Sequence, residues 1–179
     1  GLAPDGGSSG DLAAHDPAAN VVDHAWVSVD WTLARAMRTR RFWWIAIGYF
    51  CALFVWYAVQ VHQTKYLVEV GFSAAEAAWA LGFVSVVAIP GQIGLGALSD
   101  RIGREWVWAI ACFGFVLCYL ALLGLTVWPS IWLVYAMVIV QGTLGYGLTS
   151  VMGAVVLEIF QGKHYGTIFG TVMLAALAG

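Results

Sequence analysis

The sequence predicts an all-α integral membrane protein, and three observations support this fold class. Of the 179 residues, 61% are hydrophobic and only 10% are charged, whereas soluble domains typically carry about 25% charged residues. The mean hydropathy is +0.83. The apolar residues are gathered in runs close to the roughly 20 residues that a helix needs to cross the bilayer. We therefore expect a helical bundle whose solvent is lipid.

Composition also excludes several function classes. The net charge of −2 provides no basic surface for nucleic acid, so no nucleic-acid partner is expected. No metal-ligand cluster, nucleotide loop or nucleophile with a base is visible in the apolar runs, so we expect no metal, no cofactor and no enzymatic activity. Cys51, Cys112 and Cys118 all fall inside apolar runs, and we interpret them as packing residues.

The first 41 residues precede the apolar runs. Residues 1–29 are rich in Gly, Ala, Ser and Asp without apolar periodicity, which predicts a flexible central linker. Residues 30–41 begin with Asp30, a candidate helix cap. They carry a cluster of four arginines, Arg35, Arg38, Arg40 and Arg41. We expect a short basic surface helix against anionic headgroups, with a solvated basic linker as the alternative.

The rest of the chain, 42–179, is predicted to form a transmembrane bundle. Four full spans are expected at 42–62, 74–98, 106–128 and 131–157, and a shorter apolar run follows at 165–179. Because this last run stops after 15 residues without a polar cap, we expect it to be a truncated fifth span and the chain to be a fragment of a longer protein.

Basic residues predict the orientation of the spans, because Lys and Arg are retained on the cytoplasmic side. Seven of the eight basic residues fall on one side, and only Lys65 falls on the other. This places the linker on the cytoplasmic side of a plasma membrane, or of the inner membrane in a bacterium. Five tryptophans lie at span ends, as an aromatic belt requires: Trp43, Trp44, Trp106, Trp128 and Trp132.

The second and fourth spans are more polar than a lipid-facing helix needs to be. Pro90 in the second span removes a helical hydrogen bond, which predicts a kink. In the fourth span, Gln141, Gly145 and Thr149 recur every four residues on one face. Amides and hydroxyls at membrane depth belong in a bundle interior or a wet cavity.

The link between the second and third spans combines glycines with charged residues. Its marked positions are Gly96, Asp100, Arg101, Gly103 and Arg104. This stretch resembles the cytoplasmic signature loop of the major facilitator superfamily, G-x-L-x-D-R-x-G-R followed by a basic residue. Glu105 stands where the pattern has a basic residue. In this departure the stretch is similar to the second copy of the loop, which lies between helices eight and nine of the family.

The resemblance implies part of a major-facilitator-type bundle, about helices seven to eleven of twelve, whose partner is an N-terminal half. It also implies that the link is a conformational latch, while a simple topology anchor is the alternative. Residues 30–43 and 161–170 resemble the oxalate/formate antiporter and monocarboxylate-transporter branch. That branch places an acid and an arginine on helix eight, where this chain has Ser85 and Ile89, so its substrate cannot be transferred.

In the family, helices seven and ten line the substrate cavity. The polar candidates for this cavity are Tyr49, Tyr57, Gln60, His62, Ser85, Gln92, Gln141, Tyr146 and Thr149. A histidine changes charge near neutral pH and suits a proton relay, with interfacial hydrogen bonding as the alternative for His62. For the glutamines and tyrosines, interhelical hydrogen bonding is the alternative to substrate contact.

These observations predict a secondary active transporter in a lipid bilayer. It would move a small solute by alternating access, either a small carboxylate or another organic metabolite. It would act as an antiporter or symporter with a coupling proton or a counter-solute. The competing class is a non-transporting multi-span membrane module, such as an assembly or receptor subunit.

Overall fold

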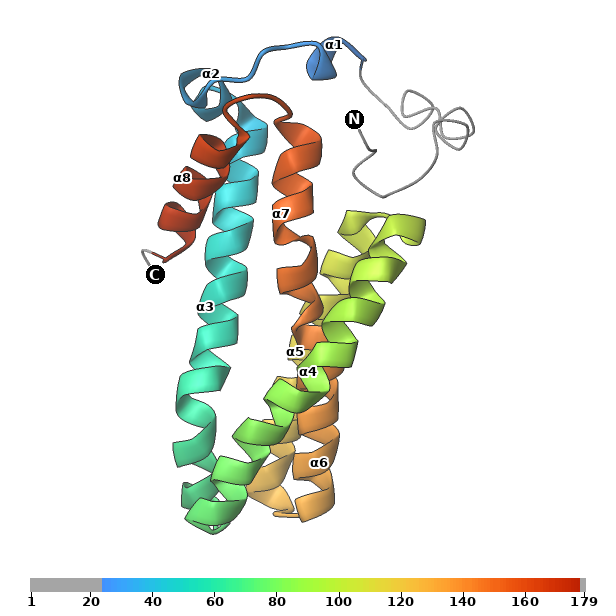
Figure 1. The fold of residues 1–179 in the computed structure, drawn as a ribbon. Helices are drawn as coiled ribbons and strands as arrows, with labels where there is room; N and C mark the ends of the chain where they lie inside the picture. Colours follow the sequence, from blue (N-terminus) through green and yellow to red (C-terminus); the bar gives the residue numbers. More distant parts are fainter. Residues whose placement is uncertain (1–23, 178–179) are drawn as a thin grey trace.

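A computed structural model describes residues 24–177 of the chain (Figure 1). Residues 1–23 of the predicted flexible linker therefore lie outside the described part of the chain. The elements are, in order, α1 (His24–Val27), α2 (Leu33–Met37), α3 (Arg40–Glu69), α4 (Ala74–Ile102), α5 (Arg104–Val127), α6 (Ile131–Val140), the π-helical segment η2 (Gln141–Gly145), α7 (Gly147–Ile159) and α8 (Tyr165–Leu177).

The described residues form an all-helical bundle without a strand, which confirms the predicted fold class. Within residues 24–177, four helical stretches are long and apolar enough to cross a membrane. They are Arg40–Glu69, Ala74–Ile102, Arg104–Val127 and Ile131–Ile159, the last one comprising α6, η2 and α7. In Figure 1, α8 runs beside the first half of α3, and α4 crosses obliquely toward α6.

The link between α4 and α5 is much shorter than the sequence pattern indicates. Helix α4 continues through Asp100 to Ile102, and α5 begins at Arg104. Only Gly103 lies between the two helices, with φ +97° and ψ 153°. A residue without a Cβ adopts this positive φ at little cost, so one glycine reverses the chain direction. The charged residues of the latch therefore project from helices and not from a loop.

The segment before α3 is more ordered than the predicted linker. Residues 24–29 include α1, and the Trp26 Nε1 group donates a hydrogen bond to the Ile159 carbonyl oxygen at 2.7 Å. The Trp31 ring meets Phe160 edge-on at 5.3 Å between centroids. Burying these aromatic rings against the end of α7 offsets the ordering entropy that low apolar content otherwise leaves uncompensated. For residues 24–29 the linker prediction is wrong.

The predicted basic helix at 30–41 is shorter in the structure. Only Leu33–Met37 is helical as α2. Thr39 then caps α3 by accepting a hydrogen bond from the Phe42 backbone N–H at 3.3 Å. Arg40 and Arg41 consequently belong to the first turn of α3. The cap interrupts the basic cluster because its residue has extended backbone angles.

The fourth span is not one regular α-helix. The segment η2 inserts a π-helical turn, in which the Tyr146 backbone N–H donates to the Gln141 carbonyl oxygen at 3.3 Å. The backbone of η2 packs directly against α4 at Gly91. A side chain there would not fit, because a Cβ on Gly91 would lie only 2.6 Å from the Gly142 carbonyl oxygen. Helix α4 itself continues through Pro90, where a kink remains a prediction.

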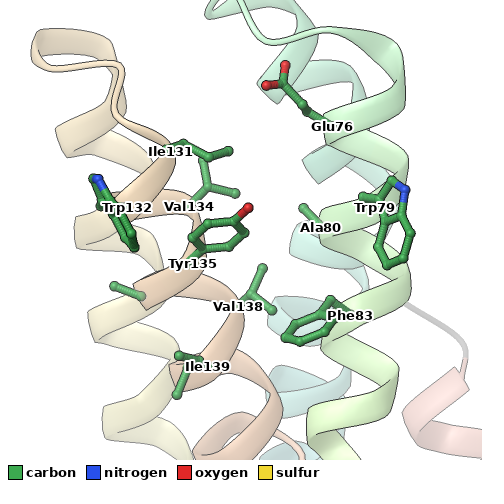
Figure 2. Close-up of a pocket in the computed structure, with 11 residues that line it drawn as sticks. Glu76, Trp79, Ala80, Phe83, Ile131, Trp132, Val134, Tyr135, Val138 and Ile139 are labelled. Carbon is green, nitrogen blue, oxygen red and sulfur yellow. The ribbon is translucent and has the colours of Figure 1, made fainter.

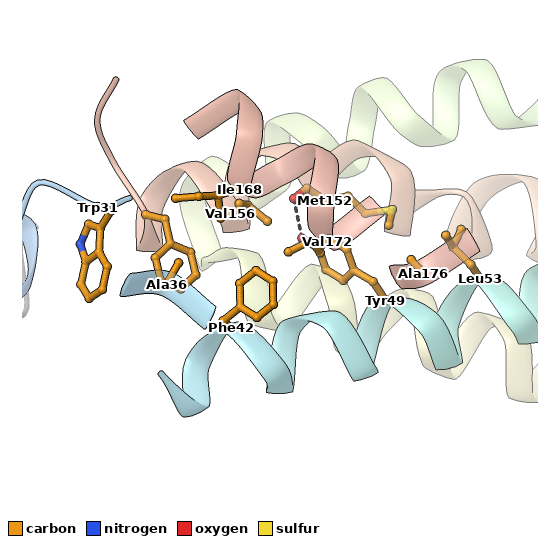
Figure 3. Packing of buried hydrophobic residues seen from close by; sticks show 11 residues of the cluster. Trp31, Ala36, Phe42, Tyr49, Leu53, Met152, Val156, Ile168, Val172 and Ala176 are labelled. Carbon is orange, nitrogen blue, oxygen red and sulfur yellow. Dashed lines mark hydrogen bonds between the residues drawn. The ribbon is translucent and has the colours of Figure 1, made fainter. Parts of the chain in front are cut away.

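Two large apolar clusters, together with a smaller one around Val107, pack the described helices against one another. One joins α3, α7 and α8 around Phe42 and Phe160, and it includes Tyr49, whose hydroxyl donates to the Met152 carbonyl oxygen (Figure 3). The other joins α3, α4, α5 and α6 and contains the buried Cys118. Cys51 and Cys112 are exposed, so the packing interpretation fails for both of them.

Candidate functional site

A hydrogen-bonded polar network connects α3 to the π-helical segment of the fourth span. The Gln141 Nε2 group donates to Gln60 Oε1 at 3.3 Å. The Gln60 Nε2 group in turn donates to the Tyr146 hydroxyl at 3.1 Å. Gln141 is fully buried, whereas Gln60 and Tyr146 are half-buried. Three of the predicted candidate residues are therefore brought together, and one side of the network is accessible.

Trp56 adds an aromatic wall that sequence reasoning missed. Its ring meets the Tyr146 ring nearly perpendicularly, at 5.5 Å between centroids. Trp56 lies one helical turn before Gln60, and this i, i+4 spacing is the signal that could have found it. Within residues 24–177, neither Trp56 Nε1 nor Gln141 Oε1 has a hydrogen-bond partner. Such buried orphan groups are rare and need an explanation.

A second polar pair lies on the adjoining face of α4 and α7. The Thr149 hydroxyl is 3.3 Å from Gln92 Oε1 and 2.8 Å from the Tyr146 carbonyl oxygen. A hydroxyl has one proton, and the shorter contact is the better hydrogen bond. Gln92 Oε1 is thereby left as an available acceptor. Ser85 is exposed on α4, about two turns before Gln92.

The remaining cavity candidates lie apart from this network. Tyr49 is only 2% exposed and its hydroxyl bonds within the apolar cluster, which is a structural role. Tyr57 and His62 are exposed and line a cavity of about 310 Å³ between α3 and α8. Neither side chain is hydrogen-bonded to Gln60 or Gln141.

The predicted latch is centred on Arg104 at the start of α5. Its guanidinium forms an ion pair with Asp100 at 2.7 Å and donates through Nε to Glu158 Oε1 at 3.0 Å. It also donates to the hydroxyl of the buried Ser99. Glu158, on α7, was missed because no local pattern pairs it with a residue 54 positions earlier. Arg104 thus joins α4, α5 and α7.

Two other predicted latch residues, Arg101 and Gly96, take no part in the interactions of Arg104 described above. The Arg101 side chain is exposed on the last turn of α4. A Cβ built on Gly96 would meet Ser150 Cβ at 3.8 Å, an ordinary van der Waals contact. Of these two α4 glycines, Gly91 rather than Gly96 lies in close backbone contact with the fourth span.

A larger apolar groove lies between α4 and α6 (Figure 2). It has a volume of about 830 Å³, and aromatic residues such as Phe83 and Tyr135 line it. Glu76 lies at one end, where its carboxylate caps α4 by accepting hydrogen bonds from Ser73. The sequence did not predict this groove, because it arises where two segments distant in the chain diverge.

The fold and the site together define a class, namely multi-pass membrane proteins with polar groups between their spans. The sequence pattern of the Major Facilitator Superfamily matches residues 4–179, and the chain belongs to this family. A search among curated proteins found no match.

Family membership confirms the predicted class at the level of a membrane transporter. Members of the family are transporters and not enzymes, which fits the expectation of a non-enzyme. The alternative of a non-transporting membrane module is not favoured.

Proposed function

We propose that the chain forms about helices seven to eleven of a twelve-helix secondary transporter. In this proposal it belongs to the C-terminal half, and α3, α4, η2 and α7 line the path of a small solute. The observation that carries the proposal is the network of Gln60, Gln141 and Tyr146 between apolar spans. Polar side chains at membrane depth are costly and typically mark substrate paths. The π-helical segment beneath them is of a type frequent at functional sites.

The latch provides a candidate element for alternating access. Asp100, Arg104 and Glu158 connect three helices through one guanidinium. Sliding of α7 relative to α4 would break the pair with Glu158. The pair with Asp100 would remain, because Asp100 and Arg104 are joined by the short turn at Gly103. The ion pairs would therefore favour one of two conformations. The basic residues support a cytoplasmic position for this end, and a proton or counter-solute would drive the cycle.

Uptake by the full-length protein in proteoliposomes tests both roles. We expect Gln141→Ala to reduce solute uptake because Gln60 loses a partner and the site loses an amide. Asp100→Asn and Glu158→Gln should each reduce the transport rate by biasing the conformational equilibrium. Lys65→Gln is a matched control, since Lys65 pairs with Glu69 at an exposed position outside the network and the latch. Unchanged uptake in all three site and latch variants would show that the assigned roles are wrong.

A further inference from the structure

We infer that the polar network binds an uncharged solute that carries several hydroxyl groups, such as a polyol or a small sugar. This inference rests on the proposed transport function and names the substrate class of that same site. It goes beyond the family resemblance, which by itself leaves the substrate open.

The accessible side of the network offers both donors and acceptors. The hydrogen bonds run in one direction, from Gln141 through Gln60 to Tyr146. The Tyr146 hydroxyl proton then has no acceptor among the described residues and is available to a solute. Gln92 Oε1 and the Thr149 oxygen provide acceptors on the adjoining face. A hydroxyl group both donates and accepts, so neighbouring hydroxyls match such a mixed surface.

The network consists of uncharged side chains. In α3, the nearest lysine or arginine to Gln60 along the chain is Lys65, which pairs with Glu69 at 3.5 Å, while His62 is exposed and lines the separate cavity beside α8. The Lys65 side chain is 80% exposed. No charged residue is among Gln60, Gln92, Gln141, Tyr146 and Thr149. Among the groups that this chain contributes, a bare carboxylate or ammonium would lose its hydration without gaining a counter-charge, which is far more costly than desolvating a hydroxyl.

The buried side of the network holds the accessible groups in place. Gln141 fixes the Gln60 amide, and the Trp56 ring packs edge-on against Tyr146. Trp56 is half-buried, so part of its ring remains available to the C–H groups of a solute. An aromatic surface beside several neutral hydrogen-bonding groups suits a molecule with an apolar carbon frame and hydroxyl substituents.

The test compares neutral and charged probes on the full-length protein in proteoliposomes. The neutral probes are radiolabelled mannitol, xylose and glucose, and the charged probes are acetate, oxalate and choline. We expect uptake of at least one neutral probe, with no uptake of the charged ones. Tyr146→Phe removes the hydroxyl that would donate to the solute and that accepts from Gln60, and it should raise the KM of the neutral probe about threefold to tenfold. Tyr119→Phe is the matched control, because its hydroxyl makes only a long contact of 3.4 Å at the exposed face of α5.

Each outcome decides a different point. Uptake of charged probes alone would overturn the inference and leave the proposed transport function standing. Uptake of a neutral probe with an unchanged KM in both Tyr146→Phe and Gln60→Leu would overturn the assignment of the site. A folded protein that takes up none of the six probes, as judged by an unchanged thermal unfolding profile, would overturn the inference. If it also exchanges no solute from a cell extract, the proposed function fails as well.

Discussion

Two buried glutamines, Gln141 in the network and Gln63 outside it, differ in how their amides are satisfied. Gln141 donates one hydrogen bond to Gln60, and only its Oε1 atom lacks a partner. Gln63 is 1% exposed, and neither its Nε2 nor its Oε1 atom has a partner within residues 24–177. It lines an apolar cavity of about 230 Å³ between α3 and α5. Gln63 therefore bears a desolvation cost that Gln141 partly avoids.

Replacing Gln63 with leucine is expected to stabilise the protein. The substitution removes an unpaired amide from an apolar environment, and the cost of such a group is about 1–3 kcal/mol. We expect Gln63→Leu to raise the thermal unfolding temperature of the detergent-solubilised protein. Gln141→Leu is the control, which should not stabilise because it removes the hydrogen-bond partner of Gln60. A lower unfolding temperature for Gln63→Leu would show that its amide is satisfied by water or a ligand.

The contact between α4 and η2 shows how two helical elements reach backbone contact. A Cβ built on Gly91 would lie 2.6 Å from the Gly142 carbonyl oxygen and 2.7 Å from Thr143 Cα. These are backbone atoms, which cannot move aside as a side chain can. Gly94, one turn further along α4, has no such neighbour within 4 Å. Of these two glycines, only Gly91 allows the elements to touch.

This difference predicts opposite effects of alanine at the two positions. Gly91→Ala should destabilise the protein by about 1–3 kcal/mol, because an added methyl group forces the two elements apart. Gly94→Ala should be neutral or slightly stabilising, since alanine has the higher helix propensity. Thermal unfolding of the two purified variants measures the difference. Equal stability of both variants would contradict the close contact.

The elements that composition and periodicity specify were predictable, and those that depend on tertiary partners were not. The spans follow from apolar length, and Gly103 marked the turn between α4 and α5. The order at residues 24–29 depends on Phe160, which is remote in sequence. Similarly, Glu158 and Trp56 acquire their roles only through contacts across the bundle. The network residues were recognised by polarity, but their grouping needed the π-helical turn.

At the scale of the whole molecule, burial is unevenly distributed among the spans. In its most apolar window, the fourth span is 44% buried, against 22–28% for the other three. The polar network lies on this most enclosed span, as expected for groups that avoid hydrocarbon. The five tryptophans at span ends are by contrast exposed by 49–77%. This arrangement matches indole rings at the two membrane interfaces.

The number of spans between two lysines predicts on which side of the membrane each one lies. Lys65 is near the end of α3 and Lys163 follows α7, so three candidate spans separate them. An odd number of crossings places them on opposite sides. If the basic residues around α2 and at Arg104 lie on the cytoplasmic side, as the positive-inside rule predicts, Lys163 lies there too.

Cysteine labelling in intact cells tests this orientation. Starting from a variant without Cys51, Cys112 and Cys118, we expect Lys65→Cys to react with a membrane-impermeant maleimide in intact cells. Lys163→Cys should react only after the cells are permeabilised. The reversed pattern would place the latch on the outer side and overturn the cytoplasmic assignment. Reaction of both positions from the same side would show instead that one of the three intervening helices does not cross the membrane, because the bilayer admits the reagent from one face only.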